Sequence, residues 1–502
     1  MNPTLADLAP LSLDLMLVGA ILWVFVLDLV RPSGAGREAG YLTALALAGI
    51  LVASFFVRTD GTVFAGSFQG GGWSVFFDRV FLVSGLVSVL GSIEHVARHH
   101  AHRQAEYYIL LMSSLLGMLL LPGVRDLLLL VVCFELMGIP LYVLSAFAKT
   151  EAHEGGEVNA PEAGLKLYLV GVVSTAITLF GLSLVFGLSG TTSIAKLGHT
   201  APSPLLGVAL LLVLAGMGFK IGSVPFHMWV PDTYQGSGTP FVAFLSVAPK
   251  LAGFTALAAV FLLGFGHQVQ AWRPVVVALS LVSILGGNLL ALAQTNVKRL
   301  LAYSGIGHIG YMLMAFAVTG PDGASMLLFY AAAYALTNTG AFLVVEAVGA
   351  DGGDDSISSM AGLYKRSPIL ALAMLLFLLS LAGIPFVVGF WAKLYVFMAA
   401  WQVGFRALVV IGAVMAVVSL FYYMQVARAM YMRKPEEDAG ELRPGRALRL
   451  GVLLCLIGVV GVGAYPAPLL TEAQNAADPL FAPATPAAPQ TSAALAFGQN
   501  DD

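Results

Sequence analysis

Long apolar runs constrain this chain more than any other feature. Crossing the hydrocarbon core of a bilayer takes roughly 20 apolar residues of helix, and the sequence contains such runs almost from end to end. Only 11% of the residues are charged, against about 25% in soluble domains. We therefore predict an all-α polytopic membrane protein without a soluble domain between the runs, because a helix in lipid satisfies its own backbone hydrogen bonds.

About fourteen transmembrane helices are expected from the length of these runs. Proline interrupts the seventh and the twelfth, which we predict to be broken helices. The predicted spans are 11–30, 41–58, 77–96, 107–122, 125–148, 164–188, 204–230, 239–265, 274–293, 300–318, 323–348, 368–399, 406–432 and 447–465.

The most informative stretch is residues 220–250, KIGSVPFHMWVPDTYQGSGTPFVAFLSVAPK, which carries charges inside a very apolar region. Pro225 must break or kink the helix that brings in Lys220. Such a break survives in lipid only where protein or a water-filled cavity covers the freed backbone. Lys250 is expected about 17 Å along the next helix, near the middle of a ~30 Å core. A broken helix beside buried lysines is typical of a transporter core.

A second broken helix is predicted in SLAGIPFVVGFWAKLY, residues 380–395. Both breaks place Pro-Phe shortly before a tryptophan, which indicates an internal repeat, although a chance Pro-Phe pair is the alternative. Five helices per unit is an odd number, so the two units would have inverted topology. The predicted division is three N-terminal transmembrane helices in 1–106, five-helix repeats in 107–265 and 266–435, a C-terminal transmembrane helix in 436–471 and a disordered Ala/Pro-rich tail in 472–502.

Four charged residues within the spans are interpreted as a proton relay. An ionisable residue inside a membrane segment is functional by default, and burial makes a lysine easier to deprotonate. Glu135 is expected near mid-membrane, where it could pair with a lysine, and a purely structural ion pair is the alternative. The proposed relay residues are Glu135, Lys220, Lys250 and Lys393.

Three further residues are secondary candidates. Lys166 lies only a few residues inside its helix and could simply extend to the interface. His227 and His308 lie in broken or glycine-rich segments and could pass protons near neutral pH, or could be hydrogen-bonded core histidines. Asp14, Asp28, Glu94 and Glu346 lie nearer helix ends and are interpreted as contacts to headgroups or neighbouring subunits.

Several functions are not expected of this chain. Cys133 and Cys455 lie in separate apolar runs, so neither a disulfide framework nor a metal motif is predicted. The sequence has no P-loop and no C-x-x-C motif, and we predict no cofactor in this chain. The histidine-rich run HVARHHAHRQ (95–104) is interpreted as a solvated loop rather than as a metal site. The N-terminus lacks a basic region and a cleavage site, so the first apolar run is expected to be a retained helix.

Basic residues in the short loops predict the orientation. Of the 25 lysines and arginines, about fifteen fall in loops on one side and about six on the other, and the richer side is normally cytoplasmic. Residues 31–40, 97–104 and 433–446 are therefore predicted to face the cytoplasm. Both termini would lie outside it, in a bacterial inner membrane.

Several blocks resemble the proton-translocating antiporter-like family, which includes membrane subunits of NADH-quinone oxidoreductase, or respiratory complex I. The resemblance covers most of residues 107–432, is most specific at 220–250 and is closest to the group called subunit N. It implies fourteen helices with two inverted five-helix repeats, each with a broken helix. The blocks are ELMGIPLYVLSAF (135–147), EAGLKLYLVGVVSTAITLFG (162–181), the whole of 220–250, NLLALAQTNVKRLLAYSGIGHIGYML (288–313) and SLAGIPFVVGFWAKLYVF (380–397).

The resemblance also implies roles. Glu135 and Lys220 match the acidic and basic partners of the first half-channel, Lys250 the central lysine and Lys393 the lysine of the second broken helix. Lys393 argues against the M-type subunits, which have an acid there, and the chain is too short for an L-type subunit with its long lateral helix.

The implied protein is a membrane-arm subunit that moves protons while NADH, FMN, iron–sulfur clusters and quinone are handled by partner subunits. Its expected partners are subunits K and M, the lateral helix of L and lipid, with no nucleic acid. Two alternatives stay open: a D-type subunit of a multisubunit cation/proton antiporter, and a structural membrane-arm scaffold.

Overall fold

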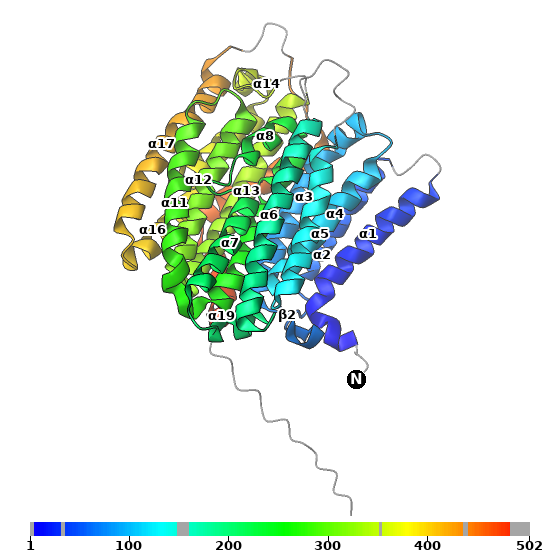
Figure 1. Ribbon diagram of the computed structural model, residues 1–502. Coiled ribbons are helices and arrows are strands. Elements are labelled where there is room, and N and C mark those ends of the chain that lie inside the picture. Colours follow the sequence, from blue (N-terminus) through cyan, green and yellow to red (C-terminus); the bar gives the residue numbers. More distant parts are fainter. Residues whose placement is uncertain (1–4, 32–35, 148–159, 351–353, 435–439, 482–502) are drawn as a thin grey trace, which may run out of the picture.

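The protein is a bundle of long helices that run roughly side by side (Figure 1). The computed structural model describes residues 5–31, 36–147, 160–350, 354–434 and 440–481. The α-helices are α1 (Ser12–Val30), α2 (Glu38–Ala53), α3 (Gly72–His99), α4 (Gln104–Leu120), α5 (Leu127–Ser145), α6 (Ala160–Ser189), α7 (Pro204–Ile221), α8 (Trp229–Gly236), α9 (Thr239–Leu245), α10 (Ala248–Leu257), α11 (Val269–Ala291), α12 (Val297–Val318), α13 (Gly320–Gly349), α14 (Leu363–Arg366), α15 (Pro368–Ala382), α16 (Val388–Gln402), α17 (Arg406–Met432), α18 (Arg446–Ala464) and α19 (Ala467–Phe481).

Short elements join these helices. A small antiparallel hairpin pairs β1 (Gly61–Val63) with β2 (Phe68–Gly70) just before α3. A π-helical segment, Ala258–Gly264, continues α10. The 3₁₀ segments are Leu5–Leu11, Phe64–Gly66, Leu121–Gly123, Ile194–His199, Gly266–Gln268 and Ser358–Met360.

The predicted class, an all-α polytopic membrane protein, is confirmed. Among the described residues, 12 helical segments are long and apolar enough to cross a membrane. The other two predicted spans correspond to α2, which has only 16 residues, and to the pair α15 and α16, which have 15 residues each. The two inverted repeats and the domain limits drawn from them stay a prediction.

Burial distinguishes a protein core from a lipid-facing rim. In α12, α13 and the segment Thr239–Gly264, 94% of the most apolar window is buried, against 22% in the segment that contains α1. Exposed apolar side chains such as Trp23 cost nothing when their surroundings are lipid. Lys250 and Lys393 are buried within the protein and do not face the lipid.

Both predicted helix breaks are present and end in the same way. Helix α7 stops at Gly222, with φ 75°, and helix α15 stops at Gly383, with φ 86°. Glycine adopts this left-handed conformation without a Cβ penalty, and it closes many helices. The chain becomes helical again at Trp229 and at Val388. Each break therefore begins two or three residues before its proline.

The expected continuous helix over 239–265 is wrong, because a third interruption occurs there. Helix α9 ends at Leu245 and α10 begins at Ala248, with Val247 in a non-helical conformation (φ −122°, ψ −72°). Pro249 lacks an amide hydrogen and therefore suits the first turn of a new helix. Lys250 consequently lies in the first turn of α10, beside a break, and not within an unbroken helix.

The expected disordered tail is wrong over residues 472–481, which form most of α19. This helix follows Pro466 and packs on α3 and α13 through apolar residues three or four positions apart, including Ala473, Ala476 and Ala477. The abundance of alanine and proline concealed that pattern. The predicted C-terminal span of 436–471 is reduced to α18, and residues 482–502 lie outside the described part of the chain.

Candidate functional site

Glu135 and Lys220 form the expected charge pair. Glu135 is the ninth residue of α5, and Lys220 is the penultimate residue of α7. The Lys220 Nζ lies 4.0 Å from Glu135 Oε1 and donates to the Tyr142 hydroxyl at 3.2 Å. Thr175, on α6, donates to the same carboxylate oxygen at 2.8 Å. Three helices thus fix the pair, and Lys220 lies between a carboxylate and a hydroxyl.

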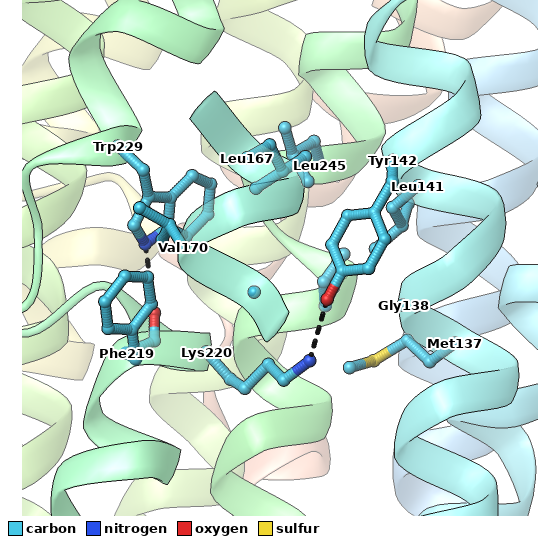
Figure 2. Close-up of a pocket in the computed structure, with 12 residues that line it drawn as sticks. Met137, Gly138, Leu141, Tyr142, Leu167, Val170, Phe219, Lys220, Trp229 and Leu245 are labelled. Carbon is cyan, nitrogen blue, oxygen red and sulfur yellow. Dashed lines mark hydrogen bonds between the residues drawn. The ribbon is translucent and has the colours of Figure 1, made fainter. Parts of the chain in front are cut away.

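A small cavity extends from Lys220 toward the third break (Figure 2). Its volume is about 30 Å³, enough for one or two water molecules. Tyr142, Lys220, Leu245 and Pro249 all border it. The Trp229 Nε1 donates to the Phe219 carbonyl at 3.0 Å and holds the start of α8 against the end of α7. The cavity therefore lies between the first charge pair and the helix that carries Lys250.

Lys250 is completely buried. Its Nζ has no hydrogen-bond partner among the described residues. It lies 5.2 Å from the centre of the Tyr234 ring, and a Cβ placed on Gly305 would be 3.4 Å from Nζ. An ammonium at such a position is costly unless it is solvated or paired. The buried Asn338 Oδ1 and Tyr234 hydroxyl also lack protein partners in the described part of the chain. Such atoms are usually satisfied by internal water.

His308 lies between Lys250 and Lys393 in a cluster of tyrosines. Its Nδ1 is 2.7 Å from the Tyr330 hydroxyl and its Nε2 3.4 Å from the Tyr423 hydroxyl. The ring centre is 5.2 Å from that of Tyr334, whose hydroxyl would lie 2.8 Å from a Cβ on Gly305, beside Lys250. Of the two histidine interpretations, the structure fits a hydrogen-bonded core histidine, which is also placed to pass a proton.

Lys393 is the sixth residue of α16 and points back into the second break. Its Nζ donates to the carbonyl oxygens of Leu381 and Ala382 at 2.8 and 2.9 Å. These carbonyls end α15 and have no helical partner of their own. The amine also lies 5.1 Å from the Tyr311 ring centre. Lys393 therefore caps a helix end inside the protein, and it is 5% exposed, which does not fit an anchor at the membrane surface.

The other two candidates stand apart from this row. Lys166 is 2.9 Å from Asp232 and 2.7 Å from Glu162, with its side chain 42% exposed. Asp232 also binds Arg299 at 2.8 Å, so this network ties α6, α8 and α12 together at one end of the bundle. His227 is half-buried in the first break, and no hydrogen bond or ion pair of the described residues joins it to the lysines.

Sequence reasoning missed a second buried pair. Glu346 was assigned to headgroup or subunit contacts, which is wrong, because it is 5% exposed and its Oε1 lies 3.1 Å from His95 Nδ1. A polar cavity of about 60 Å³ adjoins the pair and is also bordered by Glu94 and Arg98. Inward, the His95 ring approaches Gly238, at the start of α9. Asp14, given the same interpretation, is buried as well. Glu346 lies seven residues after the buried Thr339 on α13, a spacing that places both on one face of a helix and could have indicated its burial.

Two apparent motifs do not form cofactor sites. No group of three or more metal-binding side chains occurs among the described residues. Residues 305–310, GIGHIG, have a dinucleotide-binding spacing, but they lie inside α12. That motif requires a turn between a strand and a helix. Gly307 and Gly310 instead allow close packing against α11, and Gly305 leaves room for Tyr334 and Lys250.

Broken helices around a buried row of lysines define an ion-translocating membrane protein of the antiporter-like type. The chain matches the family described as NADH:quinone oxidoreductase/Mrp antiporter, transmembrane, over residues 124–419. It is 38% identical to NADH-quinone oxidoreductase subunit N of Moorella thermoacetica, across 95% of this chain and all of that protein.

Two solved structures show the same architecture. A chain of respiratory complex I from Thermus thermophilus with bound aureothin superposes with a TM-score of 0.77 at 33% identity, covering 92% of this chain and 99% of that one. A chain of the Mrp complex from Dietzia sp. gives a TM-score of 0.84 at 22% identity, covering 95% and 98%, and shows the shared fold. The chain belongs to the NADH:quinone oxidoreductase/Mrp antiporter family, in the group of NADH-quinone oxidoreductase subunit N.

Proposed function

We propose that this chain is a membrane-arm subunit of a proton-pumping NADH:quinone oxidoreductase. Its full-length similarity to subunit N supports the assignment, and so does the chemistry of the buried row. The observation that carries it is Lys250, a fully buried lysine without a protein hydrogen-bond partner in the described chain. Such a group is stable only if it can be neutral or hydrated, and a group of that kind can bind and release a proton.

The proposed relay runs from the first break to the second. In the proposed first step the Glu135–Lys220 pair opens. A proton then moves from this pair through the small cavity toward Lys250. From Lys250 the route continues past Tyr334 and His308 to Lys393. The small cavity reaches Pro249, next to Lys250, and Tyr334 lies near both Lys250 and His308, so these parts of the route offer space for water or a hydroxyl. In this scheme Lys166 and His227 have structural roles.

The Glu346–His95 pair is proposed as the site where protons enter, on the side of the membrane whose loops carry more lysine and arginine. The pair borders a polar cavity, and the His95 ring lies beside Gly238 at the start of α9. Helix α9 leads along the chain to Lys250. Helix α14, which carries Lys365 and Arg366, lies at the same end of the bundle as α8, whereas α19 and β2 lie at the opposite end (Figure 1). The end that carries α14 would face the cytoplasm of a bacterium, and both termini would lie outside it.

The finer assignments complete the proposal. NADH, FMN, iron–sulfur clusters and quinone would be bound by partner subunits. Subunits K and M and the lateral helix of L would contact this chain in the membrane arm. Purification of the native complex distinguishes this assembly from a cation/proton antiporter, because only the first contains NADH-oxidising subunits.

Lys250 is also the residue to test. We expect Lys250→Ala to abolish most NADH-driven proton pumping in the assembled complex, and Lys250→Arg to fail too, since a guanidinium does not release its proton in proteins. Lys365→Ala, at an exposed position on α14, is the matched control and should pump normally. Pumping at the wild-type rate by an assembled Lys250→Ala complex would leave only a scaffold role.

A further inference from the structure

A second, larger cavity is an apolar groove whose lining includes none of the proposed relay residues. Its volume is about 270 Å³, nine times that of the cavity beside Lys220. It runs between α3 and α13 and is closed at one end by α19. Small side chains on α13 leave the space, and larger ones on α3 and α19 form its walls: Ala332, Ala335, Phe76, Val80, Val83 and Leu469.

The mouth of the groove carries two opposite charges. Arg79, on α3, lies over the Phe55 ring at 4.0 Å and donates through Nε and Nη2 to the side chain and carbonyl of Ser54. Its Nη1 lies 3.7 Å from Glu472 of α19, which is too long for a hydrogen bond. The Arg79 side chain is 26% exposed and that of Glu472 63%. The guanidinium is thus fixed in place with one edge available, and the carboxylate beside it is solvated.

We propose that this groove binds a zwitterionic phospholipid with an ammonium headgroup, such as phosphatidylethanolamine. One acyl chain fills the apolar groove, the phosphate accepts from Arg79, and the ammonium lies against Glu472. Val80 and Val83 follow Arg79 along α3 and continue the apolar wall for about 6 Å at 1.5 Å per residue, so the groove takes the first part of an acyl chain whose phosphate lies at Arg79.

The paired charges select this occupant over others. Arginine suits phosphate because its planar fork donates two parallel hydrogen bonds. A glycerol headgroup has the same phosphate for Arg79 but no ammonium, so it would leave the Glu472 carboxylate without a cation from the lipid. A neighbouring apolar helix would fill the groove but would leave the free edge of Arg79 unpaired at the contact, which is costly.

The test uses the assembled complex in phosphatidylcholine vesicles that contain a trace of photoreactive lipid. Three probes with the same diazirine-bearing acyl chain and ethanolamine, glycerol or choline headgroups are compared. After irradiation, labelling is measured on peptides from α3 and α19. We expect the ethanolamine probe to label these peptides most strongly. Arg79→Gln should lower that labelling about tenfold, the loss of one charge-assisted hydrogen-bond pair, and Glu472→Gln should remove the preference for ethanolamine over glycerol.

Two controls keep the result interpretable. Arg273→Gln removes an arginine that lies over Phe405, away from the groove, and should leave labelling unchanged. Val83→Phe fills the groove with Arg79 and Glu472 intact, and should lower labelling by all three probes. Equal labelling of wild type, Arg79→Gln and Val83→Phe would overturn the proposal. So would the absence of labelling in wild type, as would cross-linking of the groove to another subunit in place of lipid.

Discussion

The Glu135–Lys220 pair offers the most direct test of coupling along the relay. At a separation of 4.0 Å, two unit charges attract each other by about 4 kcal/mol at an effective dielectric constant of ~20. The Glu135 side chain is 32% exposed, so screening by water reduces this to roughly 2 kcal/mol. That energy corresponds to about a 30-fold change in an equilibrium constant. It is large enough to hold the two side chains together as a pair.

Glu135→Gln removes the charge while preserving the shape of the side chain. The Lys220 ammonium, only 12% exposed, then keeps the Tyr142 hydroxyl as its partner. We expect NADH-driven proton pumping by the assembled complex to fall by about an order of magnitude, because the buried Lys220 no longer has an opposite charge as its partner. Glu135→Asp keeps the charge at a longer distance and should be milder.

Pumping is measured as proton uptake into sealed vesicles per NADH oxidised. Glu162→Gln is the matched control, because Glu162 also pairs with a lysine, at 2.7 Å, but both side chains are about half exposed. Exposed pairs of this kind contribute about 0–1 kcal/mol, so this variant should pump normally. Wild-type pumping by Glu135→Gln, or equal losses in the two variants, would refute the reasoning.

Three more predictions follow from the same structure. Lys393→Ala should assemble but pump slowly, and Lys393→Arg should also fail because guanidinium keeps its proton; full pumping with arginine would indicate an anchor only. Glu346→Gln should slow proton uptake, whereas Glu94→Gln, at the same cavity, should have little effect. A larger effect of Glu94→Gln would place the entrance elsewhere. A cysteine at position 102, an exposed position of the 97–104 loop, in a background without the two native cysteines, should react with an impermeant reagent only from the cytoplasmic side, and labelling from outside would invert the topology.

Sequence periodicity predicted most of the fold, since a bilayer imposes a length and a composition on each span. It could not predict the interruption before Lys250. Pro249 is as compatible with the first turn of a helix as with a kink. Beside the interruption, Asn338 Nδ2 donates to the Ser246 hydroxyl at 2.8 Å, a contact across 92 residues that periodicity does not reveal. The same limit explains α19, whose apolar stripe becomes recognisable only once α3 and α13 are beside it.

The charged row was predictable residue by residue, but its connections were not. Lysines and a glutamate within apolar runs are conspicuous in a sequence. The hydroxyls that link them are not, because a tyrosine in such a run is equally suited to core packing. Tyr334 and His308 meet across α13 and α12, and Tyr142 reaches Lys220 from α5. Those contacts depend on helix rotation, which hydropathy leaves undetermined.

The two helix breaks differ in a way that gives Lys393 a particular task. At the first break a neutral donor, the indole of Trp229, satisfies the end of α7. At the second, Lys393 satisfies the last carbonyls of α15. A charged lysine has three donors, and a neutral one still has two, so Lys393 can lose its proton without releasing either carbonyl. Those carbonyls also carry the partial negative charge of the helix end, which favours the ammonium. An unbroken helix would present no free carbonyls at this depth, so the break itself stabilises the charged state that a proton relay must occupy.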